Sequence, residues 1–123
     1  MGQNSSQISP EATIAEYIEA CRAGSAERLQ TIFHPNAQMA GYYQGDFYIG
    51  NPKPFFDEIR DNGNLSKSGV AYTGDITRVE VAGDVASVTL KEEGYFGVSL
   101  TNWFHLAMLD GRWEIISKSY QDE

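Results

Sequence analysis

The first third of the chain carries a helical pattern of apolar positions. One stripe recurs at the spacing of a helix face: Ile14, Tyr17, Ile18 and Cys21. Ser9 and Pro10 supply a capping hydroxyl and a proline suited to the first helical turn, so we expect a helix from Pro10. Gly24 ends that helix, Ser25 caps a shorter second one, and Pro35 stops it. The pattern predicts a helical hairpin.

The remainder of the chain has mainly the pattern of strands. Two aromatic runs around Gln44-Gly45 predict a hairpin within residues 39–49, and Asn51-Pro52 starts a third helix. Four strand-like segments joined by tight turns follow: Ile76–Ala82, Val85–Glu92, Val98–Leu109 and Arg112–Tyr120. The order α-α-β-β-α-β-β-β-β predicts an α+β fold with an antiparallel sheet.

The turn Asp110-Gly111 predicts how the last two strands pair. If Leu109 lies opposite Arg112, the core face collects Phe104, Leu106, Met108, Trp113 and Ile115, because directly opposed residues share a face. The outer face then collects Trp103, His105, Ala107, Glu114, Ile116, Lys118 and Tyr120. One hairpin earlier, the same arithmetic places Thr77 opposite Leu90 in the core.

Two large aromatic residues, Trp103 and Tyr120, are thus expected on the outer face, more than scattered exposure supplies. We therefore expect a homodimer through this face. Its predicted interface is Trp103, His105, Ile116 and Tyr120. The alternative is that the C-terminal tail covers part of the face.

Composition excludes several classes of function. The 123 residues suit one domain, and 17 acidic against 9 basic residues give a net charge of −8. This balance argues against nucleic-acid and anionic-membrane surfaces, and no segment has the apolar length of a membrane span. The lone Cys21 favours a reducing, cytoplasmic location. Residues 1–9 are expected to be a flexible leader, and 10–123 the single domain.

Three stretches resemble one known family. They are Ile14–Ala37 with its F-H-P-x-A exit, the strand Asp84–Val88, and the hairpin Trp103–Ile115 around D-G-x-W-x-I. The chain is similar to the nuclear transport factor 2-like (NTF2-like) family, in its bacterial SnoaL-like and "putative lumazine-binding" branch. The resemblance implies a cystatin-like cone: a strongly bent antiparallel sheet around the N-terminal helices, an internal pocket, and frequent dimers. Family members include isomerases, dehydratases, cyclases, accessory subunits and proteins of no known activity.

Candidate ligand-binding residues are those on elements expected to line the cone. They are Tyr17, Tyr42, Phe47, Phe55, Phe56, Asn102 and Phe104. The aromatic members equally suit a packed core. Family enzymes often place an aspartate near the position of Asn102 for acid–base work, as the resemblance implies. An amide cannot titrate, so Asn102 is expected to hydrogen-bond a ligand or, alternatively, a backbone group at the end of the sheet.

The sequence assigns no catalytic residue and predicts no metal or cofactor site. His34 and His105 lack metal-ligand spacing, and no phosphate loop is present. Glu92 and Glu93 point to opposite faces of a strand and are expected to be solvated. Three functions stay open: a dimeric domain that binds a small apolar molecule in the cone, a cofactor-independent lyase or isomerase acting on a small cyclic substrate, and a non-catalytic interaction or assembly subunit with a filled cone.

Overall fold

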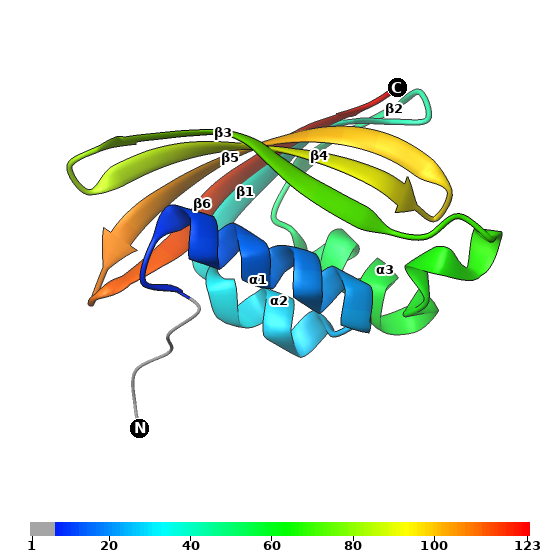
Figure 1. Cartoon of the computed structure of the whole chain (residues 1–123), viewed down its shortest axis with the longest axis horizontal. Helices are drawn as coiled ribbons and strands as arrows, with labels where there is room; N and C mark the ends of the chain where they lie inside the picture. Colours follow the sequence, from blue (N-terminus) through cyan, green and yellow to red (C-terminus); the bar gives the residue numbers. More distant parts are fainter. Residues whose placement is uncertain (1–6) are drawn as a thin grey trace.

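Three helices lie against the concave face of one curved sheet (Figure 1). The computed structural model describes residues 7–123. The helices are α1 (Pro10–Ala23), α2 (Ala26–Ile32) and α3 (Lys53–Asn62), with a 3-10 turn at Leu65–Ser68. The strands are β1 (Phe33–Tyr43), β2 (Asp46–Gly50), β3 (Thr73–Ala82), β4 (Val85–Tyr95), β5 (Val98–Leu109) and β6 (Arg112–Asp122). The predicted order of elements is confirmed.

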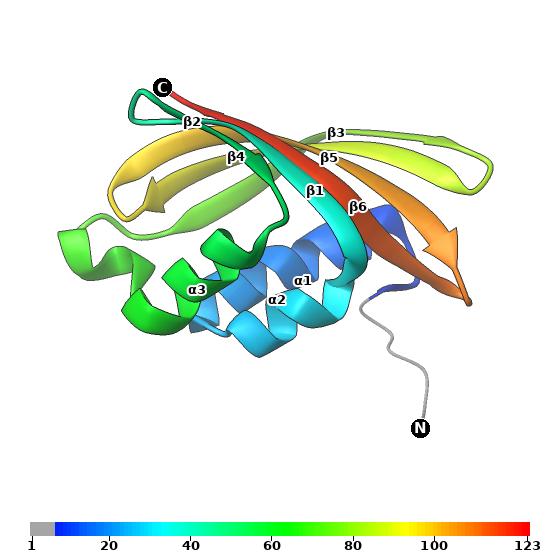
Figure 2. The same ribbon diagram turned by 180° about the vertical axis from the view of Figure 1, so that it is seen from behind.

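The sheet has the strand order β2-β1-β6-β5-β4-β3. Strands joined by hairpins pair in antiparallel fashion. The one departure from the expected antiparallel arrangement is β1, which pairs with β6 in parallel, and the two lie side by side in Figure 2. These strands are not joined by a hairpin, so no turn imposes opposite directions on them. The bent sheet around N-terminal helices is therefore a mixed one.

A β-bulge interrupts the last hairpin. The predicted pairing is confirmed from Leu109–Arg112 to Leu106–Ile115, but His105 then pairs with Ser117, so Ile116 is an extra residue in β6. A one-residue slip turns every following side chain to the other face. Lys118 and Tyr120 therefore lie on the concave face, opposite Phe104 and Asn102, and their predicted place on the outer face is wrong.

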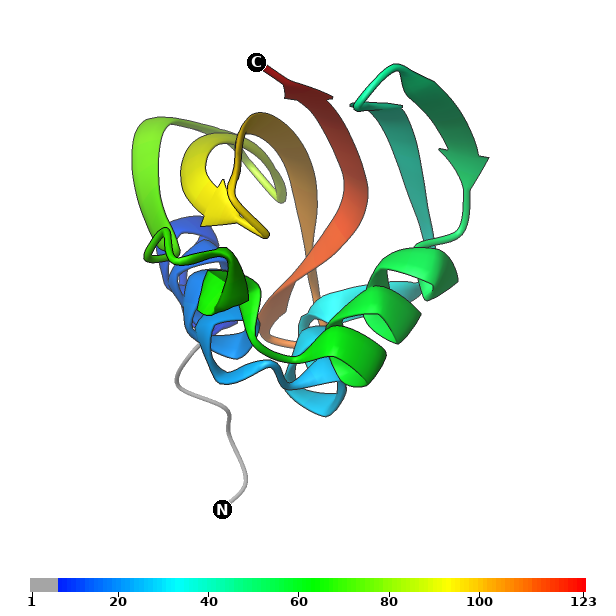
Figure 3. The same ribbon diagram turned by 90° about the vertical axis from the view of Figure 1, so that its right-hand side faces the viewer.

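A second bulge lies in the β3–β4 hairpin. Arg78 pairs with Thr89, but Ile76 pairs with Leu90, so the predicted opposition of Thr77 and Leu90 is wrong. In both hairpins the arithmetic assumes an unbroken ladder, which a bulge breaks by adding one unpaired residue to one strand. Bulged strands bend and twist more strongly, which accounts for the arch of the sheet over the helices in Figure 3.

Helix α1 packs one face into the core, where Ile14, Tyr17, Ile18 and Cys21 are all buried. The predicted apolar stripe is therefore confirmed. The Ser9 side chain accepts a hydrogen bond from the Ala12 backbone N–H at 3.0 Å, as its capping position predicts. Gln7 is also buried, and its Nε2 donates to the Trp113 carbonyl at 3.1 Å. Gln7 therefore packs against β6, whereas residues 1–6 of the predicted leader lie outside the described residues.

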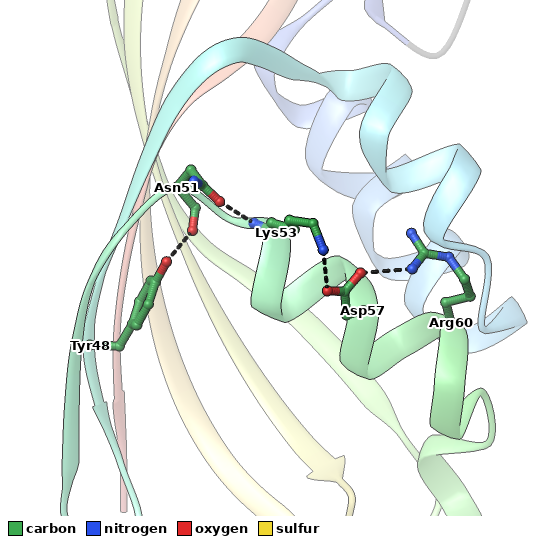
Figure 4. Close-up of polar contacts among 5 residues, drawn as sticks. All are labelled: Tyr48, Asn51, Lys53, Asp57 and Arg60. Carbon is green, nitrogen blue, oxygen red and sulfur yellow. Dashed lines mark hydrogen bonds and ion pairs between the residues drawn. The ribbon is translucent and has the colours of Figure 1, made fainter.

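Polar contacts fix the start of α3 at the edge of the sheet (Figure 4). The Tyr48 hydroxyl donates to the Asn51 carbonyl at 2.6 Å, and Asn51 Oδ1 accepts from the Lys53 backbone N–H at 2.8 Å. Asp57 then forms ion pairs with Lys53 at 2.8 Å and Arg60 at 2.7 Å along the solvent side of the helix. The opposite side of α3 turns its aromatic residues toward the sheet. No helix within residues 7–123 is long and apolar enough to cross a membrane.

The junction of the helices yields a test of the fold. Gly24 has φ +66°, and a Cβ there would lie 2.2 Å from the carbonyl oxygen of Gly63, at the end of α3. Gly83 has a similar φ of +61° but open space around it, so Gly83→Ala is a matched control for the backbone strain alone. We expect Gly24→Ala to lower the free energy of unfolding by about 1–3 kcal/mol more than Gly83→Ala. Urea unfolding followed by circular dichroism measures both, and equal losses would contradict the prediction.

Candidate functional site

A buried carboxylate lies on the concave face of the sheet. Glu92 on β4 is 2% exposed, so the prediction that it is solvated is wrong. The Tyr72 hydroxyl donates to its Oε2, and Asn102 Nδ2 donates to its Oε1 at 2.6 Å. Both carboxylate oxygens thus accept a hydrogen bond from a buried side chain. Strand alternation required one of Glu92 and Glu93 to point inward, and β4 continues past Glu92 to Tyr95, which places Glu92 inside the cone.

Asn102 serves a purpose that neither sequence-based alternative names. It is fully buried, and its amide nitrogen donates to a carboxylate oxygen of Glu92. Its Oδ1 has no hydrogen-bond partner among the described residues. The direct contact of Asn102 with a ligand stays a prediction.

Lys118 is the basic group of the site. Its side chain is 6% exposed, and its Nζ lies 4.4 Å from the ring centroid of Phe55 and 4.6 Å from that of Tyr120. Within residues 7–123, Nζ makes no hydrogen bond and no ion pair within 4.0 Å. The two rings attract a positive charge and hold the nitrogen in place. Lys118 therefore presents an amine without a hydrogen-bond acceptor.

Glu92 and Lys118 line one cavity of about 210 Å³. Its walls are largely aromatic: Tyr43, Tyr48, Phe55, Tyr95 and Tyr120. Glu58 from α3 supplies a further carboxylate. Pockets for drug-sized ligands measure about 300–1,000 Å³, so this cavity suits a smaller molecule. The combination of an apolar wall with a few charged groups is typical of small-molecule sites.

Burial sets the proton affinities of the site. Loss of solvation raises the pKa of Glu92, whereas the charge of Lys118 and the hydrogen bonds from Tyr72 and Asn102 act in the opposite direction. Loss of solvation lowers the pKa of Lys118, and the charge of Glu92 opposes this shift. Burial also raises the pKa of Tyr72, so its hydroxyl keeps its proton and donates. The site thus contains an acid and a base whose pKa values shift toward each other.

Of the predicted ligand-binding residues, Phe55 lines the cavity. Tyr42 and Phe47 are 48% and 56% exposed on the outer face, so the prediction that they line the cone is wrong. Strand alternation sends their neighbours Tyr43 and Tyr48 inward instead. The remaining predicted residues are buried in the core and do not line this cavity: Tyr17, Phe56, Asn102 and Phe104.

The predicted interface residues are divided between the two faces. Trp103 is 43% exposed and His105 is exposed on the outer face, and Ile116 is half-buried at the bulge. Tyr120 lines the cavity, so its predicted place in an outer interface is wrong. Glu92 and Lys118 are cavity residues that the sequence pattern did not identify. Glu92 could have been recognised, because it lies two residues after Leu90 on β4 and therefore faces the core as Leu90 does. The sequence held no such indication for Lys118, because the bulge decides which face its side chain is on.

Comparisons with known proteins agree with the fold. The family described as "Putative lumazine-binding" matches residues 6–121. The aldolase FrzH of Cladobotryum sp. is 28% identical over 116 residues, which cover 89% of this chain and 85% of that protein.

Solved structures of low identity share the fold. An NTF2-like protein of unknown function from Methylobacillus flagellatus has a TM-score of 0.82 at 24% identity over 92% of this chain and 88% of its own. One from Silicibacter pomeroyi has 0.81 at 23% identity over 92% of both chains. A Nostoc punctiforme domain with a cystatin-like fold has 0.71 at 17% identity over 98% of this chain and 80% of its own.

The raised pKa of Glu92 predicts a pH-dependent cost to stability. Above the ordinary glutamate pKa of 4.5, the unfolded chain releases this proton before the folded chain does. The free energy of unfolding therefore falls as pH rises from the unfolded-state pKa of 4.5 to the higher pKa of the folded state. The loss is about 1.4 kcal/mol for each pH unit in this interval. We expect Glu92→Gln to remove this loss and so to gain stability relative to the wild type as pH rises.

Urea unfolding at a series of pH values measures this difference. The exposed neighbour supplies the control, since Glu93→Gln should keep the pH profile of the wild type. Parallel profiles for the wild type and Glu92→Gln would contradict the prediction.

Proposed function

Because the chain belongs to the "Putative lumazine-binding" family and shares the fold of NTF2-like proteins, we propose a function for its cone: cofactor-independent proton transfer on a small carbonyl compound. The observation that carries this proposal is the buried carboxylate of Glu92 in one aromatic cavity with the amine of Lys118. The proposal combines two of the open hypotheses, a small molecule in the cone and a lyase or isomerase. The cavity argues against the third, a cone filled by its own side chains.

Glu92 is the proposed proton acceptor. A carboxylate whose pKa is raised by burial exchanges protons near neutral pH more effectively than a solvated one. It would take a proton from the carbon next to a carbonyl group, and the electron pair left behind would move toward the carbonyl oxygen. Return of the proton to another carbon isomerises the substrate. With a β-hydroxy ketone, Glu92 would instead take the hydroxyl proton. The hydroxyl oxygen then becomes a carbonyl oxygen, the neighbouring carbon–carbon bond breaks, and its electron pair forms an enolate, which is the reaction of a lyase. Tyr72 and Asn102 position the carboxylate without touching the substrate in this scheme.

One relative favours carbonyl chemistry. FrzH is named an aldolase, and aldolases act at a carbon next to a carbonyl group. At 28% identity, the name of this relative supports only the class of reaction proposed for the present chain. The kind of substrate is inferred from the cavity. The cavity has a volume of about 210 Å³ and is lined by five aromatic side chains, which favours a substrate with a compact, mostly apolar ring.

Deuterium exchange tests the role of Glu92. In deuterated water, nuclear magnetic resonance follows the loss of the protons next to the carbonyl of cyclohexanone, and the same spectra follow cleavage of a β-hydroxy ketone that carries a phenyl group. We expect Glu92→Gln to reduce the rate by about 10²–10⁴-fold, because the amide cannot accept the proton. Glu93→Gln, on the exposed side of the same strand, should keep the wild-type rate.

The same ketones separate an enzyme from a simple binding domain. If they raise the melting temperature of the wild type without any exchange or cleavage, the chain binds and does not catalyse. Equal rates for the wild type and Glu92→Gln would contradict the assignment of the base.

The homodimer through the outer sheet face stays a proposal. Exposed Trp103 supports it, and so does Ile49 at 67% exposure, which belongs to the same row of paired residues across β5, β6, β1 and β2. We expect the wild type to sediment as a dimer and Trp103→Glu to sediment as a monomer, because a buried unpaired charge opposes association. Sedimentation velocity measures both, and a monomeric wild type at micromolar concentration would contradict the proposal.

A cytoplasmic location is likewise proposed. Cys21 is free and fully buried in α1, and burial raises the pKa of its thiol, which keeps it unreactive. A free cysteine with a structural role suits a reducing compartment.

A further inference from the structure

The nitrogen of Lys118 has an unusual environment for a lysine. Lysine side chains normally keep the ammonium group in water, even where the methylene stem is buried. Here the residue is only 6% exposed, and its nitrogen lies over the rings of Phe55 and Tyr120 at the wall of the cavity. Exposed lysines on the same protein, such as Lys91 on β4, provide an internal comparison.

The carboxylates that face the cavity are engaged elsewhere. Glu92 accepts hydrogen bonds from Tyr72 and Asn102 on its two oxygens, and Glu58 Oε2 accepts from Asn62 Nδ2 at 2.7 Å. Among the described residues, neither carboxylate lies within 4.0 Å of the Lys118 nitrogen as an ion pair. The other titratable groups around the cavity are the phenols of Tyr43, Tyr48, Tyr95 and Tyr120. The amine of Lys118 is therefore available to a molecule in the cavity.

Burial also favours the uncharged, nucleophilic form of this amine. Loss of solvation lowers the pKa of Lys118 despite the negative charge of Glu92. A lower pKa leaves a larger fraction of the amine uncharged near neutral pH. A desolvated lysine in an apolar pocket is the usual setting for a lysine that reacts with carbonyl groups.

We propose that Lys118 binds the substrate covalently: its Nζ attacks the carbonyl carbon of a small, uncharged aldehyde or ketone in the cone and forms an imine. This inference rests on the proposed function and assigns a nucleophile to it. The nitrogen forms a bond to the carbonyl carbon, the oxygen leaves as water after taking up two protons, and a carbon–nitrogen double bond remains. No oxidant or reductant is required.

The imine completes the proposed proton transfer. A protonated imine withdraws electrons from the neighbouring carbon more strongly than a neutral carbonyl does, so the proton that Glu92 removes becomes more acidic. The electron pair then moves to nitrogen and gives an enamine. Protonation of the enamine at carbon and hydrolysis of the imine restore the amine of Lys118 and release the product.

Reductive trapping tests this inference directly. The full chain is incubated with benzaldehyde or cyclohexanone and sodium cyanoborohydride, which converts an imine into a stable secondary amine. Trapping adds the mass of the carbonyl compound less one oxygen atom, and peptide mapping locates it. We expect several-fold more label on Lys118 than on Lys91, because only Lys118 of the two lines the cavity, and no label at position 118 in Lys118→Arg. Lys91→Arg is the matched control and should keep the label on Lys118.

The map of the wild-type protein decides the outcome even if Lys118→Arg fails to fold. Labels spread evenly over Lys53, Lys67, Lys91 and Lys118, or absent from Lys118, would overturn the inference. If Glu92→Gln abolishes deuterium exchange while Lys118 carries no label, proton transfer stands and the covalent step falls. If Lys118 is labelled but exchange survives in Glu92→Gln, the covalent step stands and the role of Glu92 falls.

Discussion

The site depends on a single extra residue in β6. Ile116 interrupts the ladder between β5 and β6, and from that point each side chain of β6 faces the side opposite to the one that a regular hairpin would give it. Without the bulge, Lys118 and Tyr120 would point outward and the cone would lose its amine. The same irregularity bends the strand over the helices, so one local defect both shapes the cavity and places its basic group.

Helix packing then determines the chemistry of the acidic group. Glu92 lies on a strand that α1 also contacts, and this cover removes its carboxylate from water. An unsatisfied buried charge would cost several kcal/mol. Hydrogen bonds from Tyr72 and Asn102 offset part of that cost, but the pKa stays raised. The cone thus maintains a carboxylate that destabilises the fold at neutral pH, which is a common property of catalytic groups.

Sequence patterns predicted the features that depend on local spacing. The order of elements, the buried stripe of α1 and the pairing from Leu109–Arg112 to Leu106–Ile115 follow from helical periodicity, caps and a two-residue turn. The bulges could not be predicted, because an extra residue costs little locally and depends on how the sheet bends over the helices. Tyr42 and Phe47 show how an error of one residue along a strand reverses the predicted face. Both lie on the outer face, whereas the next residue along each strand, Tyr43 or Tyr48, lines the cavity.

The presence of an amide and not a carboxylate at position 102 has a physical explanation. The resemblance to family enzymes implies an aspartate in this region of β5, and the amide in its place cannot titrate. In the structure, Asn102 Nδ2 lies 2.6 Å from a carboxylate oxygen of Glu92 on the neighbouring strand. A second carboxylate at that distance would repel the first, and the two would have to share a proton. An amide that donates a hydrogen bond is therefore the compatible partner, and the buried carboxylate of the cone lies one strand away from the expected position.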